Sequence, residues 1–441
     1  MSRNLEELPA FDFASRRRAL LDRIGEGIAV FRAPPLAVHA NDVEYRYRPE
    51  SNFYYLTGFT EPDAVAVLDG SAEKDRFVLF VQPRDPERET WTGKRAGVEG
   101  AIETFGADAA FPIAELAGEL TPRIAKAKGL HYRVGVDEAF NHRMLDLART
   151  SWASRPRTSN DLPTSLYDPG PLVHEMRLMK SPEELAWMRT AIDVAAEAHV
   201  AAIREARPGL GEFEVEALVE YVFRKSGASG WAYPSIVAGG ANATVLHYTA
   251  NADRLRDGEL LLIDAGCELG FYCADITRTF PIGRDYTVAQ RRVYDLVLAA
   301  QRAALAAVRP GATIEQIHER ALETLVDGLL SFGLLDGAAE RVISEGLFKP
   351  YYMHRTSHWL GMDVHDAGAY NVDGQPRPLE PGMVLTVEPG LYFSPQLADV
   401  PEEYRGIGIR IEDDVLVTPA GHEVLSAKVP KDPDEILALR G

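Results

Sequence analysis

Two aspartates stand inside an apolar stretch of the sequence, where an isolated charge is destabilising. The run LLLIDAGCELGFYCADITRTF, residues 260–280, carries Asp264 and Asp275 among aliphatic, aromatic and small side chains. It predicts a β-hairpin that turns between Leu269 and Gly270, so the two aspartates would face each other with Cβ atoms about 4.5–5.5 Å apart. Such a pair could share one proton, clamp a cation or lie at a solvated edge.

Of these three possibilities, further acids and histidines in the sequence favour a bound cation. Glu388 ends the apolar run MVLTVE, Glu412 lies in the β-like run GIGIRIEDDVLV, and MHRTSHWLGMDVHD contains His354, His358 and His365. Carboxylates with an imidazole suit manganese, and they also accept cobalt or zinc. Two divalent cations would neutralise four carboxylates, and a hydroxide held between them could attack a polarised carbonyl. The residues therefore predict a dinuclear metallohydrolase.

Charge and cysteine content indicate which binding partners and which cellular compartment to expect. The chain has 441 residues, a formal net charge of −19 and two cysteines, Cys267 and Cys273. The excess of negative charge disfavours nucleic acid and anionic membrane surfaces. The sequence contains neither a secretory signal nor an apolar run long enough to span a bilayer. We expect buried thiols in a reducing compartment, and a cytoplasmic protein without nucleic-acid or membrane partners.

The order of elements predicts two domains. Residues 1–172 alternate strand-like runs (23–33, 63–70, 75–83 and 132–138) with helical ones, which is typical of an α/β domain. A proline-containing segment over 159–181 separates them from residues 173–441. Ser181, followed by Pro182 and Glu184, predicts the N-terminus of a long helix.

An internal repeat runs through the second domain. Arg-Pro-Gly precedes an amphipathic run at 207–209 and again at 309–311, and each run is later followed by a strand that ends in an acid. The acid comes six residues after a glycine in both halves, from Gly258 to Asp264 and from Gly382 to Glu388. We expect an α+β domain of two related halves around a pseudo-twofold axis, each supplying an acid to a shared site.

The motifs together resemble one family. DAG…ADITRTF, SHWLGMDVHD, TVEPGLY and GIRIEDD occur in the order found in pita-bread metallopeptidases of the bacterial Xaa-Pro aminopeptidase (aminopeptidase P) type. YRYRPESNFYYLTGFTEPDAVAVL and RDPERETWTG look like that family's N-terminal domain, and LVHEMRLMKSPEE looks like its junction. The resemblance covers nearly the whole chain and implies an N-terminal α/β domain followed by a pita-bread catalytic domain.

The resemblance also implies the site. It assigns two divalent metal ions to Asp264, Asp275, His358, Glu388 and Glu412, with Asp275 and Glu412 bridging. It places His247 and His365 against the substrate, with His354 close by, Arg410 behind the ligands and Tyr392 near the metals. Arg355 departs from the family, which often has glycine there, so we expect a local change at the pocket entrance.

The implied reaction removes one N-terminal residue from peptides with proline second. The hydroxide between the metals would attack the scissile carbonyl, and Glu388 would pass a proton to the proline nitrogen. The resemblance further implies a homo-oligomer, dimer or tetramer, in which the N-terminal domain controls substrate access and Trp91 reaches a neighbour's site. Alternatives are an Xaa-Pro dipeptidase with the same ligands and a non-enzymatic peptide-binding module.

Overall fold

The chain forms two compact units. A computed structural model describes residues 5–153 and 165–440. The N-terminal unit is Phe11–Arg177, and the C-terminal unit runs from Leu178 onward together with the stretch before Phe11. The division therefore lies between Arg177 and Leu178, whereas the sequence analysis places it after residue 172.

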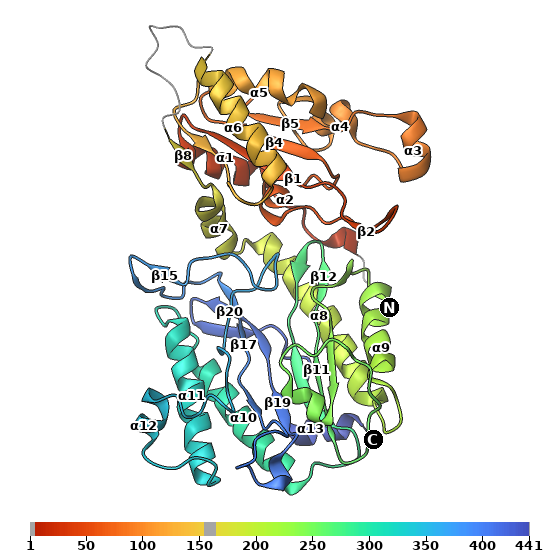
Figure 1. The fold of residues 1–441 in the computed structure, drawn as a ribbon, viewed down its shortest axis with the longest axis vertical. Helices are drawn as coiled ribbons and strands as arrows, with labels where there is room; N and C mark the ends of the chain where they lie inside the picture. The colour runs from red at the N-terminus through yellow and green to blue at the C-terminus, as the bar shows by residue number, and fades with distance from the viewer. Residues whose placement is uncertain (1–4, 154–164, 441) are drawn as a thin grey trace. The chain divides into compact units, whose positions relative to one another are not determined.

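One sheet organises the N-terminal unit (Figure 1). Its strand order is β6-β5-β4-β1-β7-β8; β4 runs antiparallel to its two neighbours, β1 and β5, and the other neighbouring pairs are parallel. β2 and β3 form a separate hairpin. The strands of this unit are β1 Ile28–Ala33, β2 Val38–Ala40, β3 Val43–Glu44, β4 Ala64–Asp69, β5 Phe77–Val81, β6 Ala109–Pro112, β7 Leu130–His131 and β8 Leu166–Tyr167. The strand expected over 132–138 is wrong, because pairing stops at His131 and a turn follows it.

Helices pack apolar side chains against that sheet. The helices of this unit are α1 Phe13–Ile24, α2 Ser51–Thr57, α3 Pro86–Thr92, which buries no side chain, α4 Gly97–Glu103, η2 Ile113–Glu115, α5 Leu116–Ile124, α6 Glu138–Ala153 and α7 Gly170–Leu178, which ends at the division. Leu116, Leu120, Phe140 and Met144 of α5 and α6 are buried together with side chains of β1, β4 and β5. Such burial is the main force that holds the unit together.

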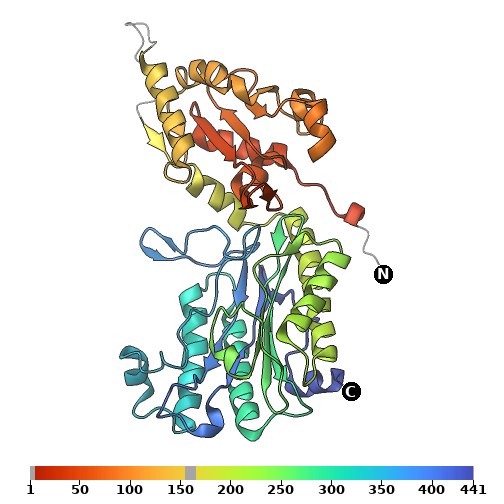
Figure 2. The same ribbon diagram turned by 45° about the vertical axis from the view of Figure 1, so that its right-hand side comes forward.

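Two pairs of helices flank the strands of the C-terminal unit. In Figures 1 and 2, α8 (Pro182–Glu205) and α9 (Glu212–Lys225) lie on one side, and α10 (Val288–Ala307) and α11 (Ile314–Ser331) lie on the other. The helix predicted to begin at Ser181 is confirmed, since Ser181 and Glu184 form a capping box in front of Pro182. The remaining helices are η1 Leu5–Glu7, η3 Gly240–Thr244, α12 Ala339–Ser344, η4 Glu402–Tyr404 and α13 Pro433–Leu439.

The strands of this unit form small antiparallel sheets. Their orders are β10-β11-β14, β13-β12-β9, β17-β20-β21, β18-β19 and β15-β16. The bounds are β9 Gly230–Trp231, β10 Ile236–Gly239, β11 Leu260–Asp264, β12 Cys267–Leu269, β13 Tyr272–Cys273, β14 Thr277–Pro281, β15 Asn371–Val372, β16 Gln375–Pro376, β17 Val384–Val387, β18 Gly390–Tyr392, β19 Gly408–Arg410, β20 Asp413–Thr418 and β21 Gly421–Val424. The expected α+β architecture, with an α/β unit before it, is confirmed.

The predicted register of the aspartate hairpin is wrong. Asp264 pairs with Thr277, and Leu269 pairs with Tyr272. The turn therefore falls at Gly270 and Phe271, whose φ angles of 58° and 68° are those of the tight turns preferred in two-residue hairpins. Asp275 lies two residues before the partner of Asp264, so the aspartates are diagonal neighbours and do not face each other directly.

The two halves repeat at the level of secondary structure. Asp264 ends β11, and Glu388 directly follows β17. Gly258 and Gly382, which stand six residues before these acids, both have positive φ angles, 80° and 99°. In both halves a glycine-dependent turn thus leads into a buried strand that delivers a carboxylate.

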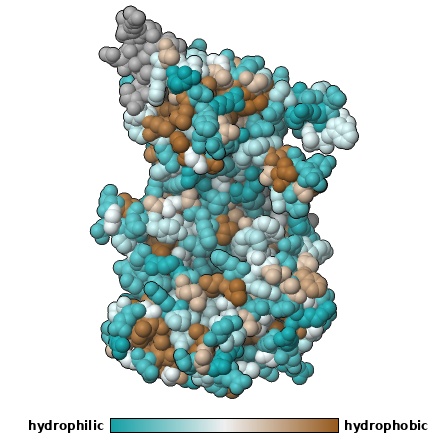
Figure 3. Space-filling view, in the orientation of Figure 1, coloured by the Kyte–Doolittle hydropathy of each residue, from teal (hydrophilic) through white to brown (hydrophobic). Residues whose placement is uncertain are grey.

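The surface has the character of an ordinary globular protein. Figure 3 shows a face that is mostly teal or pale, with brown side chains in separate small groups. Among the described residues, no helix combines the length and the apolar character that a membrane span requires.

Candidate active site

Ten candidate residues of the sequence analysis lie in the C-terminal unit, and contacts join nine of them into one cluster. The elements that deliver the acids are β11, the link from β13 to β14, the end of β17 and the start of β20. The ligand atoms of Asp275, His358 and Glu412 all lie within 4.8 Å of one another. The tertiary fold thus gathers side chains that stand up to 148 positions apart in the sequence, from Asp264 to Glu412.

Tyr233 joins the two aspartates of the hairpin. Its hydroxyl lies within hydrogen-bond distance of Asp264 Oδ1 and Asp275 Oδ1. Burial raises the pKa of Asp264, and the charge of Asp275 adds to this effect, while Arg410 opposes it. Burial and the same two carboxylates raise the pKa of Tyr233, so the tyrosine stays a donor.

Glu412 is an acid that the other carboxylates of the cluster repel. Its Oε2 accepts a hydrogen bond of 2.7 Å from Thr277 Oγ1, and its backbone N–H donates to the Thr277 carbonyl at 3.1 Å. Burial raises the pKa of Glu412 well above its usual range, and the charges of Asp275 and Glu388 raise it further. The site therefore concentrates negative charge beyond what its own cations neutralise.

Glu388 and His358 stand opposite each other. His358 Nε2 lies 3.5 Å from Glu388 Oε1 and 3.4 Å from Asp275 Oδ2, while Nδ1 faces the Trp359 carbonyl at 3.0 Å. Burial raises the pKa of Glu388 to about 7, and the neighbouring aspartates act in the same direction. Although burial lowers the pKa of His358, Asp275 and Glu388 raise it to about 9, so without a cation Nε2 carries a proton. Because Nδ1 donates to a carbonyl, loss of that proton would turn the Nε2 lone pair toward the acids, where it is available to a cation.

Arg410 is the buried cation of the site. It donates to Asp264 Oδ2 at 2.6 Å, to the Tyr392 hydroxyl at 2.8 Å and to Thr277 Oγ1 at 3.2 Å. One guanidinium therefore orients an acid, a tyrosine and the threonine that holds Glu412.

His354 is held on both ring nitrogens. Nε2 lies 2.9 Å from the Tyr392 hydroxyl, and Nδ1 lies 2.8 Å from the Arg355 carbonyl. Burial lowers the pKa of His354 to about 3, and Arg410 adds to the effect, so the ring is neutral. Tyr392 then donates to His354 Nε2 while accepting from Arg410.

His365 and His247 complete the surroundings. The His365 ring stands edge-on to His358 with 4.4 Å between ring centres. His247 lies in the exposed loop after η3, close enough for its positive charge to lower the pKa of both His354 and His365. For His365 the larger causes of the lowered pKa are burial and His358.

The donor set fits divalent metal ions. Four carboxylates and one imidazole meet in a buried place where Arg410 is the cation in contact, and the pKa values of Asp264, Glu388 and Glu412 are all raised. A divalent cation would replace protons with positive charge and would remove the mutual repulsion of the acids.

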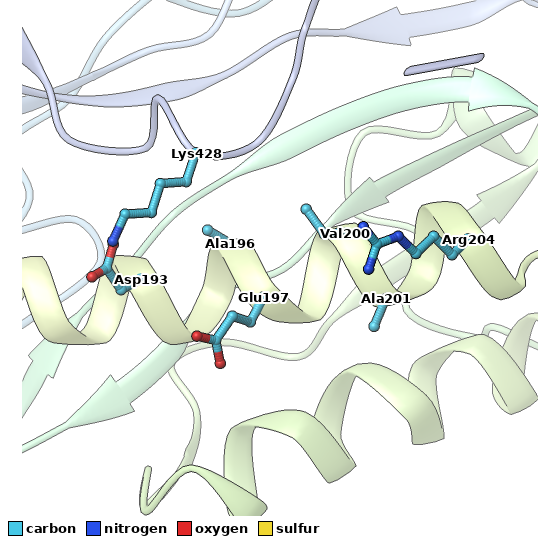
Figure 4. A pocket seen from close by; sticks show the side chains of 7 residues that line it. All are labelled: Asp193, Ala196, Glu197, Val200, Ala201, Arg204 and Lys428. Carbon is cyan, nitrogen blue, oxygen red and sulfur yellow. The ribbon is translucent and has the colours of Figure 1, made fainter. Parts of the chain in front are cut away.

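A shallow groove elsewhere in the C-terminal unit takes no part in this cluster. It follows one face of α8, and Figure 4 shows its lining residues, Asp193, Ala196, Glu197, Val200, Ala201, Arg204 and Lys428. Lys428 Nζ contacts Asp193 Oδ1 at 2.6 Å across it. None of these residues belongs to the acid cluster, so we assign the groove no catalytic role.

Sequence reasoning missed two residues of the cluster. Thr277 stands two positions after Asp275 in a β-like run, and that spacing puts both on one face; the signal was present. Tyr233, in SGWAYPSI, has no such signal, because its contact with the aspartates depends on how the segment before β10 folds over the hairpin.

Known proteins show the same organisation along the whole chain. Residues 186–419 match Metallopeptidase family M24, and residues 13–132 match the aminopeptidase P N-terminal domain. The Xaa-Pro aminopeptidase of Escherichia coli K12 is 43% identical over 99% of this chain and 98% of its own length. The Xaa-Pro aminopeptidase of Haemophilus influenzae is 39% identical over 97% and 96%.

Solved structures agree. Aminopeptidase PepP of Pseudomonas aeruginosa superposes with a TM-score of 0.94 at 45% identity, covering 97% of both chains. Zinc-substituted E. coli aminopeptidase P in complex with product gives a TM-score of 0.93 at 42% identity, again over 97% of both chains.

The fold and the acid cluster define a class, the metal-dependent peptidases. Within that class the chain belongs to metallopeptidase family M24, together with the Xaa-Pro aminopeptidases. The resemblance predicted from the motifs is thereby confirmed, as is the prediction of a metallo-aminopeptidase.

Proposed function

We propose that this protein releases the N-terminal residue from peptides that have proline in the second position, in a reaction that depends on divalent metal ions. The observation that carries the proposal is the complete set of Asp264, Asp275, His358, Glu388 and Glu412, in which the two aspartates and Glu412 are buried and His358 and Glu388 are partly buried. It stands in a chain that is 43% identical to an Xaa-Pro aminopeptidase over 99% of its residues.

These five residues would hold two ions, which we propose to be manganese, with cobalt or zinc as substitutes. Bound ions supply an activated water at neutral pH and polarise a carbonyl. Support for this assignment comes from the oxygen-rich donor set and from the His358 Nε2 that faces the acids.

The side chains around the acids divide the remaining work. Glu388, whose pKa lies near 7 without a cation, is suited to accept a proton and pass it to the proline nitrogen. That nitrogen carries no N–H in the peptide, so it must gain a proton to leave. His247 and His365 would donate to the substrate carbonyl, while Arg410 and Tyr392 orient the acids and His354.

A peptide panel tests the activity. After chelation, manganese, cobalt or zinc is returned, and an Xaa-Pro-Xaa tripeptide, the matching Xaa-Ala-Xaa tripeptide and an Xaa-Pro dipeptide are assayed by mass spectrometry. We expect metal-dependent release of the first residue from the proline tripeptide and none from the alanine tripeptide. Cleavage of the dipeptide alone would identify an Xaa-Pro dipeptidase, and no cleavage with any metal would favour a peptide-binding module.

We further propose a homo-oligomer in which the N-terminal domain restricts substrate access. Trp91 on α3, with 88% of its surface exposed, supports this idea, because so exposed a tryptophan is suited to a contact between subunits. Light scattering should give a dimer or tetramer. A monomer that is fully active on tripeptides would contradict the proposal.

For the location we propose the cytoplasm. The thiols of Cys267 and Cys273, both buried, suit a reducing compartment. Fractionation of the source cells followed by immunoblotting checks this assignment, and recovery with the secreted fraction would contradict it.

A further inference from the structure

We propose that Glu212 is a positioning residue for His247: its buried carboxylate fixes the loop that carries this histidine. The inference rests on the proposed function in one respect, the action of His247 on the substrate. The anchoring of the loop is a separate statement with its own measurement.

Glu212 is fully buried at the start of α9 and is satisfied by four neutral donors. Oε1 accepts from the Gly239 N–H at 2.7 Å and from Asn242 Nδ2 at 3.0 Å. Oε2 accepts from the Tyr248 hydroxyl at 2.8 Å and from the Asp253 N–H at 2.9 Å. A carboxylate at a helix N-terminus is also favoured by the helix dipole.

All four donors come from one segment, residues 239–253, which surrounds His247. Gly239 lies before η3, Tyr248 directly follows His247, and Asp253 lies where the loop ends. A single carboxylate therefore ties the beginning, the middle and the end of the loop to α9.

His247 itself depends on this anchoring. Its side chain is exposed and, within the described part of the chain, its ring forms no hydrogen bond or ion pair. His354, by contrast, is held on both ring nitrogens. A ring without its own partners is placed by its backbone, and the nearest side-chain anchor of that backbone is the bond from Tyr248 to Glu212.

A second buried residue ties the same loop to the strand of Asp264. Asn251, with a φ of 44°, accepts from the Val237 N–H at 3.0 Å and donates to the Ser235 carbonyl at 2.8 Å. β10, which contains Val237, pairs with β11 in a register that sets Ile236 opposite Asp264. β10 thus connects the loop to the strand that carries Asp264. Glu212 holds the part of the loop next to His247.

The chemistry requires a carboxylate here. Four donors need four lone pairs, which two carboxylate oxygens supply, whereas a glutamine would turn an NH₂ group toward N–H and O–H donors. Glu212→Gln therefore disturbs the whole anchor, whereas Tyr248→Phe removes one of its four bonds, the one beside His247, together with the long bond of 3.4 Å that the Ala252 N–H donates to the same hydroxyl.

The experiment combines hydrogen–deuterium exchange with steady-state kinetics on the metal-loaded enzyme and an Xaa-Pro-Xaa tripeptide. We expect both variants to speed amide exchange over 240–253. For Tyr248→Phe we expect kcat/KM to fall about tenfold, the effect of one lost bond to a charged group. When His247 is already replaced by alanine, Tyr248→Phe should change kcat/KM by less than about twofold, because the histidine that Tyr248 positions is absent.

Tyr272→Phe is the matched control. It removes a Tyr–Glu hydrogen bond of 2.7 Å, to buried Glu184, that lies outside the loop. It should leave exchange over 240–253 unchanged and kcat/KM within about twofold of the wild type. Unchanged exchange in Tyr248→Phe, or an equal loss of kcat/KM with and without His247, would overturn the inference. A wild type that fails on the proline tripeptide defeats the proposed function instead, and the exchange measurement still decides the anchoring.

Discussion

Glu412 and Asp413 are neighbours in the sequence and both are buried, yet their surroundings are opposite. Asp413 accepts from Arg278 Nη2 and Ser426 Oγ, each at 2.7 Å, and from Gln301 and Lys431. Although burial opposes ionisation, Arg278 and Lys431 hold the pKa of Asp413 below its usual range. Burial and the charges of other acids raise the pKa of Glu412 instead.

The difference teaches how a fold separates structural acids from functional ones. Consecutive side chains of an extended segment point to opposite sides. On one side Asp413 meets cations that belong to the protein, and it joins β14, β20 and the C-terminal segment through Arg278. On the other side Glu412 meets acids, and we propose that bound metal supplies the positive charge that this side lacks.

The largest expected effect is the loss of activity when an acid of the cluster around Glu412 is replaced. Glu388→Gln keeps the shape of the side chain and removes its capacity to accept a proton, so kcat should fall about 10³-fold. Metal affinity, measured by calorimetric titration of the apo protein with manganese, should fall as well. Activity that survives this substitution in metal-free buffer would contradict the assignment of the whole acid cluster.

A smaller effect, on stability, is expected when Asp413 is replaced, because this acid is neutralised by cations of the protein itself. Asp413→Asn leaves buried Arg278 and Lys431 without their charge partner and should lower the free energy of unfolding by about 3–5 kcal/mol. Glu412→Gln removes a repelled acid, so the metal-free protein should unfold at an equal or higher denaturant concentration than the wild type. Urea titrations of both variants in chelator measure the contrast, and equal destabilisation by the two would remove the distinction drawn between them.

A pH series sharpens the comparison. Without metal, the folded pKa of Glu388 is about 7, against 4.5 as its usual value. Below pH 4.5 the group is protonated in both states, and as the pH rises toward 7 only the unfolded chain gives up its proton freely. The metal-free protein should therefore lose stability as the pH rises through this window. Thermal unfolding in chelator checks this: Glu388→Gln should reduce the loss but not abolish it, because the pKa values of Asp264 and Glu412 are raised as well, and added manganese should restore stability at high pH.

The smallest effect is expected from an exposed ion pair. Arg355 contacts Glu315 at 3.0 Å with 57% and 36% of the side chains exposed. Solvent screens this ion pair. Its loss in Arg355→Gly should therefore change the free energy of unfolding by no more than about 1 kcal/mol. If Arg355 shapes the pocket entrance, KM for tripeptides will shift while kcat holds, and an unchanged KM would dismiss that role.

Much of the site could be predicted because its information is local. Acids inside apolar runs, histidines four to eleven residues apart, and the repeated glycine-to-acid spacing identify four acids and three histidines before any fold is known, and the family resemblance adds His247, Arg410 and Tyr392. The cap of α8 is equally local, since Ser181 and Glu184 satisfy each other's backbone. The hairpin register failed because it depended on which residues would adopt positive φ, and Phe271 did so as well as Gly270.

The sequence by itself thus determined which atoms are available: the acids, the imidazoles and the strands that carry them. Only the tertiary structure decided their circumstances. It brought Tyr233 between the aspartates, set cations around Asp413 and acids around Glu412, and closed four donors on Glu212. The physical reason is that the charge state of a buried group depends on neighbours within a few ångströms, and those neighbours come from distant parts of the chain.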